Sequence, residues 1–395
     1  MEKQPHPIIS IRSWSTLSAL GGSEATVLAS YQSVESSLTP WSVPHLDYPV
    51  DTWAGRLSKD AQQQCADLLT THPEYAGLDP SVLYAIITAR SAFSQAGWDK
   101  KTPVGINIGS SRGATQTWES AHADFMRGER IPVLTSPLTT LGNLSTWVAQ
   151  DIGVQGPEFS HSITCSTSLH ALLNAVAWMR AGMVSRFLVG GSEAALTPFT
   201  WAQMKALKLV STLNDPYPCR ALDPLKKANT MVLGEGAGAL CLEVGIRPGA
   251  QAVVLGVGYA TEALAHAISI SDQADCFVRS MHMALGVHDP GQIDAVVMHA
   301  PGTVKGDRAE TAALDAVFGA QAPWRTSHKW RTGHTFGASG ALGLECALLM
   351  LKHQHLAGIP YLGQSVWRAA SVKKVLVNAV GFGGNAVSVL LGLPE

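Results

Sequence analysis

The sequence contains few charged residues and no paired-cysteine motif. Charged residues make up 15% of the 395-residue chain, against about 25% in typical soluble domains. Lysine and arginine together number 28, and aspartate and glutamate number 30. The chain therefore has no excess positive charge for binding nucleic acid, and its low charge favours burial of apolar surface against another subunit.

The six cysteines lie far apart, and no two of them form a Cys-x-x-Cys pair. This spacing indicates neither a structural zinc site nor a disulfide framework, so we predict no metal. The N-terminus lacks the basic segment and apolar run of a signal peptide. No uninterrupted apolar stretch reaches about 18 residues, the length of a membrane-spanning helix. We therefore expect a cytoplasmic protein without a membrane span.

Short apolar runs alternate with helical patterns along the chain. Residues 104–109 and 186–190 are apolar runs that end in glycine, as is typical of strands buried on both faces. Residues 79–97 begin with Asp-Pro and end with glycine around a helical apolar pattern, which predicts a helix. The alternation predicts an α/β fold.

Two parts of the chain resemble each other. Glycine-rich turns at 234–238 and 381–384 each run into an alternating strand. Each turn also follows a small-residue turn that opens a long apolar helix, one near Cys165 and the other near Gly337. The pattern predicts a fold made of two related halves.

The two predicted halves are residues 1–248 and residues 249–395. A fresh apolar strand begins just after the Arg-Pro-Gly sequence at 247–249. The first half is longer by a segment at 196–231. Inserted loops of this kind tend to carry binding function or subunit contacts, so we expect one of these roles for the segment.

Cys165 lies in a turn of small residues that leads directly into an apolar helical stretch. At the start of a helix, the partial positive charge and the unpaired N–H groups favour the thiolate form of a cysteine. The position predicts a reactive thiol, although a buried structural cysteine would also fit it.

Two histidines lie in loops rather than on helical faces. His299 directly follows the apolar strand-like run 294–298, and His334 lies in a glycine-rich stretch. The ends of strands are where α/β folds place ligand chemistry. Each histidine taken alone would also fit a structural role.

Five ordered motifs resemble those of the β-ketoacyl-acyl carrier protein synthases. They are TCSTS around Cys165, GEGAG at 234–238, His299 with Gly302-Thr303 and GDRAE at 306–310, Lys329 with GHT at 333–335 and GASG at 337–340, and GFGG at 381–384. The chain is identified as a divergent member of the elongating Cys-His-His branch, in the thiolase-like superfamily. The resemblance implies a thiolase-like fold, with two related βαβαβαββ halves in a five-layered α-β-α-β-α arrangement, and a dimer.

The resemblance also implies a reaction. Cys165 would take an acyl group from a carrier thioester, and His299 and His334 would stabilise the enolate formed when malonyl-carrier loses carbon dioxide. Claisen condensation then gives the 3-oxoacyl product. The substrates are carried on the phosphopantetheine of acyl carrier protein, and no other cofactor is implied. The expected partners are acyl carrier protein and a second subunit, either an identical copy or one like a chain-length factor.

Further residues receive roles from the resemblance. Lys329 is implied to order the histidine loop, and the backbone N–H groups of Cys165 and Phe382 to form the oxyanion hole. Phe382 also matches an aromatic gate beside the cysteine. The remaining implied positions are the substrate contacts Thr303, Met231 and Gly383, and the loop supports Asp307 and Glu310.

Three departures from the family pattern predict altered substrate handling. Pro301 replaces a hydroxyl residue and removes a backbone donor. Met231 replaces an aromatic residue, which makes an acyl tunnel more adaptable. Gly343 stands where the family has a glutamate, and Glu345 two places later faces another side of a helix. We expect a specialised fatty-acid, polyene or polyketide pathway.

Other readings remain open from the sequence. A thiolase acting on coenzyme A esters would need a second catalytic cysteine in a glycine-rich turn near the C-terminus, and the last cysteine is Cys346 on a predicted helix. A non-condensing chain-length-factor subunit typically lacks the cysteine, and a decarboxylase-only relative would carry glutamine at position 165.

A basic patch could receive the acidic helix of the carrier protein. The candidate residues are Lys205, Lys208, Lys226 and Lys227, in or near the 196–231 segment. Solvated surface lysines are the alternative interpretation.

Overall fold

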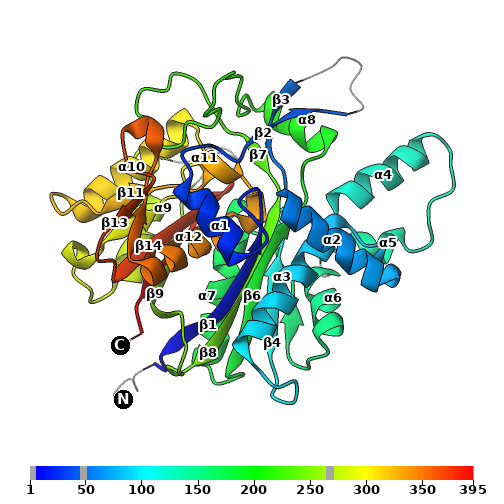
Figure 1. The fold of residues 1–395 in the computed structure, drawn as a ribbon, viewed down its shortest axis with the longest axis horizontal. Helices are drawn as coiled ribbons and strands as arrows, with labels where there is room; N and C mark the ends of the chain where they lie inside the picture. Colours follow the sequence, from blue (N-terminus) through cyan, green and yellow to red (C-terminus); the bar gives the residue numbers. More distant parts are fainter. Residues whose placement is uncertain (1–5, 45–50, 142, 264–270, 395) are drawn as a thin grey trace.

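A ten-stranded sheet runs through the part of the protein that the computed structural model describes, residues 6–44, 51–141, 143–263 and 271–394 (Figure 1). Its strand order is β11-β10-β14-β15-β9-β1-β8-β6-β4-β5. The strands of the first half are β1 Ile9–Leu17, β4 Gly105–Gly109, β5 Glu158–Phe159, β6 Arg186–Glu193 and β8 Gly236–Val244. Those of the second half are β9 Ala252–Thr261, β10 Ala295–Val297, β11 Trp324–Thr326, β14 Lys374–Gly381 and β15 Asn385–Gly392.

The two five-stranded arrays have the same internal arrangement. In the first, β8 is antiparallel to β1 and β6, while β6, β4 and β5 are parallel. In the second, β15 is antiparallel to β9 and β14, while β14, β10 and β11 are parallel. A short antiparallel contact, Ser10 with Val253 and Ile11 with Ala252, joins the arrays. The internal repeat in the sequence therefore corresponds to a repeated array of strands.

Helices form layers on both sides of each array (Figure 1). The helices are α1 Glu24–Gln32, α2 Lys59–Thr71, α3 Pro80–Ala96, α4 Thr115–Met126, α5 Thr135–Thr139, α6 Asn143–Ile152, α7 Thr167–Arg180, α8 Pro198–Ala206, α9 Asp275–Leu285, α10 Val304–Phe318, α11 Lys329–Thr332 and α12 Ser339–His353. Helices α7 and α12 pack together and touch strands of both arrays. Helices α3 and α6 pack on the first array. Helix α9 packs on the second array, and α10 packs against α9. The predicted five-layered α/β fold is confirmed.

The remaining strands lie outside the ten-stranded sheet. Strands β2 Thr39–Ser42, β3 Asp51–Gly55 and β7 Leu233–Gly234 form a small sheet, and β12 His355–Ala357 pairs with β13 Trp367–Ala369. The boundary predicted at residue 248 falls in the connection between β8 and β9. That the halves are separate domains stays a prediction. None of the described helices combines the length and apolar character needed to cross a membrane.

Helix α12 is buried along most of its length because its sequence is apolar on nearly every side. All thirteen residues from Ser339 to Leu351 are buried, as expected of a helix in the middle layer. Gly340 lets α12 approach α7 closely, since a Cβ there would lie 2.7 Å from Leu169 Cγ and from Ser168 Oγ. The start of one helix is thereby held against the start of the other.

The two central helices begin in the same unusual way. Each follows a 3-10 turn, Thr164–Ser166 before α7 and Phe336–Ala338 before α12. The first residue of each turn has a positive φ, 45° at Thr164 and 44° at Phe336, which costs a non-glycine residue roughly 1–2 kcal/mol. Strain of this kind is typical of functional sites.

Candidate active site

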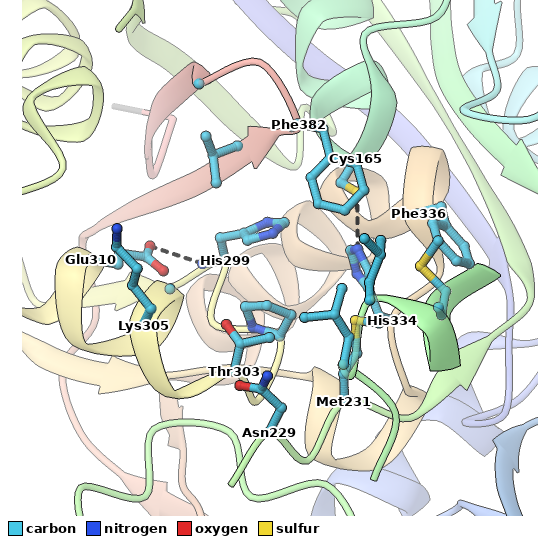
Figure 2. Close-up of a pocket in the computed structure, with 18 of the residues that line it drawn as sticks. Cys165, Asn229, Met231, His299, Thr303, Lys305, Glu310, His334, Phe336 and Phe382 are labelled. Atoms are coloured by element: carbon cyan, nitrogen blue, oxygen red, sulfur yellow. Dashed lines mark hydrogen bonds between the residues drawn. The ribbon is translucent and has the colours of Figure 1, made fainter. Parts of the chain in front are cut away.

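A cavity of 340 Å³ lies where the two central helices begin, and residues of both halves line it. Cys165 reaches it from the first half, and His299 and His334 reach it from the second (Figure 2). Phe382, at the tip of the hairpin between β14 and β15, lies beside Cys165 in the same view. Residues that are far apart in the sequence therefore meet at this cavity.

Cys165 is a buried thiol in contact with a histidine. It is 6% exposed, and its Sγ lies 3.0 Å from Nε2 of His334. Burial raises the pKa of the Cys165 thiol to about 12, although the positive charges of Lys329 and Arg112 oppose the rise. Burial therefore opposes the stabilisation of the thiolate that the helix start provides, because desolvation disfavours the charged form.

His334 is held by hydrogen bonds on both ring nitrogens. Its Nδ1 lies 3.1 Å from the Ser339 hydroxyl. Burial and the charge of Lys329 hold the pKa of His334 well below its usual value, so the ring is neutral. With a neutral ring, the thiol of Cys165 donates to Nε2 and Nδ1–H donates to Ser339. A hydroxyl can also donate, so Ser339 supports either tautomer.

His299 is also neutral and lies next to His334. The two ring centroids are 5.4 Å apart and the planes are nearly perpendicular, at 88°. Burial, with the charge of Lys329, holds the pKa of His299 well below its usual value. Its Nδ1 is buried and finds no hydrogen-bond partner among the described residues. The site therefore contains two uncharged imidazoles.

The loop that carries His299 is fixed from two sides. Glu310 accepts hydrogen bonds from the backbone N–H groups of His299 and Ala300, each at 2.9 Å (Figure 2). Lys329 donates from Nζ to the carbonyl oxygen of His299. Burial lowers the pKa of Lys329, and the negative charge of Glu310 opposes this. The two side chains thus hold the main chain on both sides of His299.

Asp307 joins the same loop to the 196–231 segment. Its carboxylate accepts from the N–H groups of Gly302 at 3.2 Å and Leu222 at 3.0 Å, and from Lys226 Nζ at 2.7 Å. The expectation that Lys226 contributes to a surface patch was wrong, because its side chain is only 5% exposed. A buried carboxylate needs a compensating charge, and Lys226 supplies it.

The Gly381 position brings the Phe382 hairpin against the cysteine turn. A Cβ on Gly381 would collide with Thr164 Oγ1 and lie 2.7 Å from the Ile163 carbonyl oxygen. Gly381, Phe382 and Gly384 line the cavity, but Gly383 does not. A substrate contact at Gly383 stays a prediction. With φ at 97°, the chain turns at Gly383, and its neighbours reach the cavity instead.

The other implied substrate contacts lie on the cavity wall. Thr303, just before α10, and Met231 both line it (Figure 2). Sequence reasoning missed several further lining residues, among them Asn229, Lys305 and Phe336. Asn229 accepts from the N–H of Val304 at 2.9 Å, a contact between distant segments that no local pattern signals.

The departures from the family pattern fall at defined places. Pro301 lines the cavity. Gly343 is buried on α12, where a Cβ would lie 3.1 Å from Val377 Cγ1. Glu345 accepts from Thr16 Oγ1 on β1 and does not line the cavity, so it takes no part in the site.

A five-layered fold with a cysteine and two histidines at one central cavity defines the class of thiolase-like acyltransferases. Residues 34–245 match the N-terminal domain of beta-ketoacyl synthases, and residues 251–361 match the C-terminal domain. The chain belongs to the beta-ketoacyl synthase family.

Known relatives are similar to the chain over most of its length. Nodulation protein E of Rhizobium leguminosarum bv. trifolii is 29% identical over 294 residues, 71% of each chain. The 3-oxoacyl-[acyl-carrier-protein] synthase 2 of Vibrio cholerae is 27% identical over 346 residues, 79% of this chain and 82% of the relative. A chain from the structure of a ketosynthase in complex with its chain length factor, from Xenorhabdus doucetiae, superposes with a TM-score of 0.82 at 19% identity, and the match covers 100% of both chains. This last likeness is one of fold.

Substitution of Gly381 by alanine should disable the cysteine turn. The added Cβ must displace Thr164 or Ile163, and a shift of about 1 Å at a reacting group costs about 100-fold in rate. We expect a loss of that order in Cys165 acylation, measured by intact mass. The control is Gly77→Ala, where a Cβ meets no atom within 4 Å. Equal rates for the two variants would contradict the role given to the close approach.

The reactivity of Cys165 should depend on pH with the sign that its raised pKa dictates. Because the pKa of the thiol is about 12 against a usual 9.0, alkylation by iodoacetamide should keep rising through pH 10 without a plateau. The unfolded protein serves as the control, and its rate should be half-maximal near pH 9 and level off about one unit higher. The rate at Cys165 is followed by peptide mass spectrometry, and a plateau below pH 9 in the folded protein would show that burial does not control this thiol.

Proposed function

We propose that this chain is a 3-oxoacyl-[acyl-carrier-protein] synthase that carries out decarboxylative Claisen condensation on Cys165. The observation that carries the proposal is the 3.0 Å contact between Cys165 Sγ and a neutral His334, with His299 beside it. This arrangement supplies a nucleophile, a proton acceptor and two hydrogen-bond donors at one cavity.

The first step is acyl transfer. Cys165 Sγ attacks the thioester carbonyl of the acyl-carrier, and its proton passes to His334 Nε2. The backbone N–H groups of Cys165 and Phe382 bind the oxygen of the tetrahedral intermediate. When the intermediate collapses, the carrier thiolate leaves and takes the proton from His334. The products are the Cys165 thioester and the free carrier thiol.

The second step uses both histidines as donors. Malonyl-carrier loses carbon dioxide, and the electron pair of the broken C–C bond forms an enolate whose oxygen accepts from His299 and His334. His334 acts here in its other neutral tautomer, reached by proton exchange with solvent, so that Nε2 carries the proton and Nδ1 accepts from the Ser339 hydroxyl. The enolate carbon then attacks the Cys165 thioester, the C–S bond breaks, and the departing Cys165 thiolate takes up a proton from solvent. Lys329, Glu310 and Asp307 act as positioning residues.

The surface of the chain supports a partner subunit. Large apolar side chains are exposed on and after α4, namely Trp118, Phe125, Met126, Val133 and Leu134. Together with the low charge of the chain, they favour a dimer with a second copy or with a subunit like a chain-length factor. The chain itself is proposed as the catalytic member, because it keeps Cys165 and both histidines. A non-condensing partner subunit would catalyse no reaction that needs these three residues.

The proposed reaction requires only carrier-bound substrates. Phosphopantetheine of acyl carrier protein presents the acyl and malonyl groups, and no metal or redox group takes part. All six cysteines are free thiols, which supports a cytoplasmic setting. Met231 and Pro301 in the cavity wall support a specialised fatty-acid, polyene or polyketide pathway.

Incubation with acyl-carrier donors of graded length should produce an acyl adduct on Cys165. Intact mass identifies the adduct, and Cys165→Ala should abolish it. Cys165→Gln should also lose loading but keep decarboxylation of malonyl-carrier, whereas His299→Ala and His334→Ala should each lower decarboxylation about 100-fold. Carbon dioxide release measures the second activity.

Two results would count against the proposed function. One is the absence of an adduct with every donor, both for the chain alone and with a partner subunit. The other is unchanged decarboxylation in both histidine variants.

Three exposed lysines of the 196–231 segment are proposed to receive the acidic carrier protein. Charge reversal of Lys205, Lys208 and Lys227 together to glutamate should slow loading from an acyl-carrier about tenfold. Transfer from a small thioester, which makes no carrier contact, should change much less. Lys373→Glu, at an exposed lysine just before β14, is the control. An equal loss of loading rate with both donors would show that these lysines do not bind the carrier protein.

A further inference from the structure

A third buried histidine, His328, lies beside the active site and takes no part in the steps above. It directly precedes α11 and is 2% exposed. It is not among the residues that line the active-site cavity, so it can act on the reaction only through its neighbours. Burial, with the charge of Lys329, holds the pKa of His328 well below its usual value. The ring is therefore neutral and can both donate and accept a hydrogen bond.

One side of the His328 ring is bound to the turn that leads to His334. Its Nδ1 lies 2.9 Å from Oγ1 of Thr332. The same hydroxyl lies 2.8 Å from the carbonyl oxygen of Gly333, the residue before His334. Thr332 is itself buried, and a buried hydroxyl needs such partners. This hydroxyl thus connects the His328 ring to the main chain next to the catalytic histidine.

The other side of the ring packs on helix α12. A hydrogen bond with the main chain of Ser339, the first residue of α12, favours the charged form of the His328 ring and so opposes the effect of burial. Nε2 of the ring lies 4.0 Å from the Cβ that a side chain at Gly343 would have. Val377 Cγ1 at 3.1 Å and Val297 Cγ1 at 3.7 Å enclose the same point. A long side chain at 343 would enter space that the ring or a valine occupies, so Gly343 leaves the room that His328 needs.

Ser339 is the residue through which these contacts reach the catalytic ring. The main chain of His334 is already fixed, because its N–H donates to the Val232 carbonyl at 2.7 Å and its carbonyl accepts from the Gly234 N–H at 3.0 Å. The orientation of the ring depends on its own partners, and Nδ1 lies 3.1 Å from the Ser339 hydroxyl. A shift of the first turn of α12 would move this hydroxyl while the main chain of His334 stayed in place.

We propose that His328 is a positioning residue for His334. Its ring, packed against Gly343, binds the α11 turn to the first turn of α12 and so holds the Ser339 hydroxyl at hydrogen-bond distance from His334 Nδ1. The inference rests on the proposed function, since it concerns the histidine that accepts the proton of Cys165. Because His328 does not line the cavity, it acts on the rate of acyl transfer and not on the binding of substrate.

The test follows acyl transfer to Cys165 from hexanoyl-N-acetylcysteamine in the full-length protein. Intact mass measures the adduct, and the rate is determined over a range of thioester concentrations. His328→Phe keeps a ring but removes its hydrogen bonds, so it should lower the limiting rate about tenfold, the factor that loss of one hydrogen bond brings. The thioester concentration that gives half of the limiting rate should stay the same, because the variant changes no contact with the substrate.

Smaller changes separate a hydrogen-bonding role from a packing role. Thr332→Val keeps the shape of the side chain but removes the hydroxyl that pairs with His328, so the limiting rate should fall several-fold. Thr332→Ser keeps the hydroxyl and should retain most of the rate. His328→Asn places an amide near the position of Nδ1 and should restore part of the rate lost in His328→Phe.

His355→Phe is the matched control. The His355 ring lies on β12, where its Nδ1 is 2.7 Å from the carbonyl oxygen of His353, and it does not line the cavity. This variant should leave both the limiting rate and the half-saturating concentration unchanged.

The outcomes separate this inference from the proposed function. An unchanged limiting rate in His328→Phe, equal rates in the two Thr332 variants, or a change in the half-saturating concentration alone overturns the inference and leaves the synthase function standing. No adduct on the unaltered protein, either from this thioester or from any acyl-carrier donor, overturns both. The Thr332 variants keep His328 in place, so misfolding of His328→Phe does not remove the test.

Discussion

The hydrogen bond between Cys165 and His334 crosses from one half of the molecule to the other, and the rest of the site depends on it. It can form only if the starts of α7 and α12 lie side by side. Gly340 permits that approach between the helices, and Gly381 brings the Phe382 hairpin against the same turn. Neither half contains a complete site, so the packing between the halves is itself part of the chemistry.

Burial of the side chains determines the resting charge of Cys165, His299 and His334. Burial keeps both histidines uncharged and the thiol protonated. A neutral imidazole can accept the thiol proton in one step and donate a hydrogen bond in another, which a permanently charged ring could not do. The ammonium group of Lys329 donates its hydrogen bond to the carbonyl oxygen of His299 and not to a reacting atom. Charge therefore develops only once the substrate thioester is in place.

The sequence predicted the features that depend on local residue patterns. Glycine and small-residue turns mark Cys165, His299 and His334, and the repeated turn-and-strand pattern predicted the two arrays of strands. Contacts between distant segments could not be predicted. Lys226 looked like a surface lysine because its partner, Asp307, lies 81 positions along the chain. Ser339 and Phe336 gain their roles only from neighbours in space.

The buried pair of Lys226 and Asp307 has a consequence for how such a protein can change over time. Loss of either charge alone leaves the other buried without compensation, which typically costs about 3–5 kcal/mol. The 196–231 segment can therefore drift freely at its exposed positions, but the two members of this pair can be exchanged only together. Sequence changes in the 196–231 segment and in the histidine loop are therefore linked through this pair. In related chains, the positions of Lys226 and Asp307 should vary together.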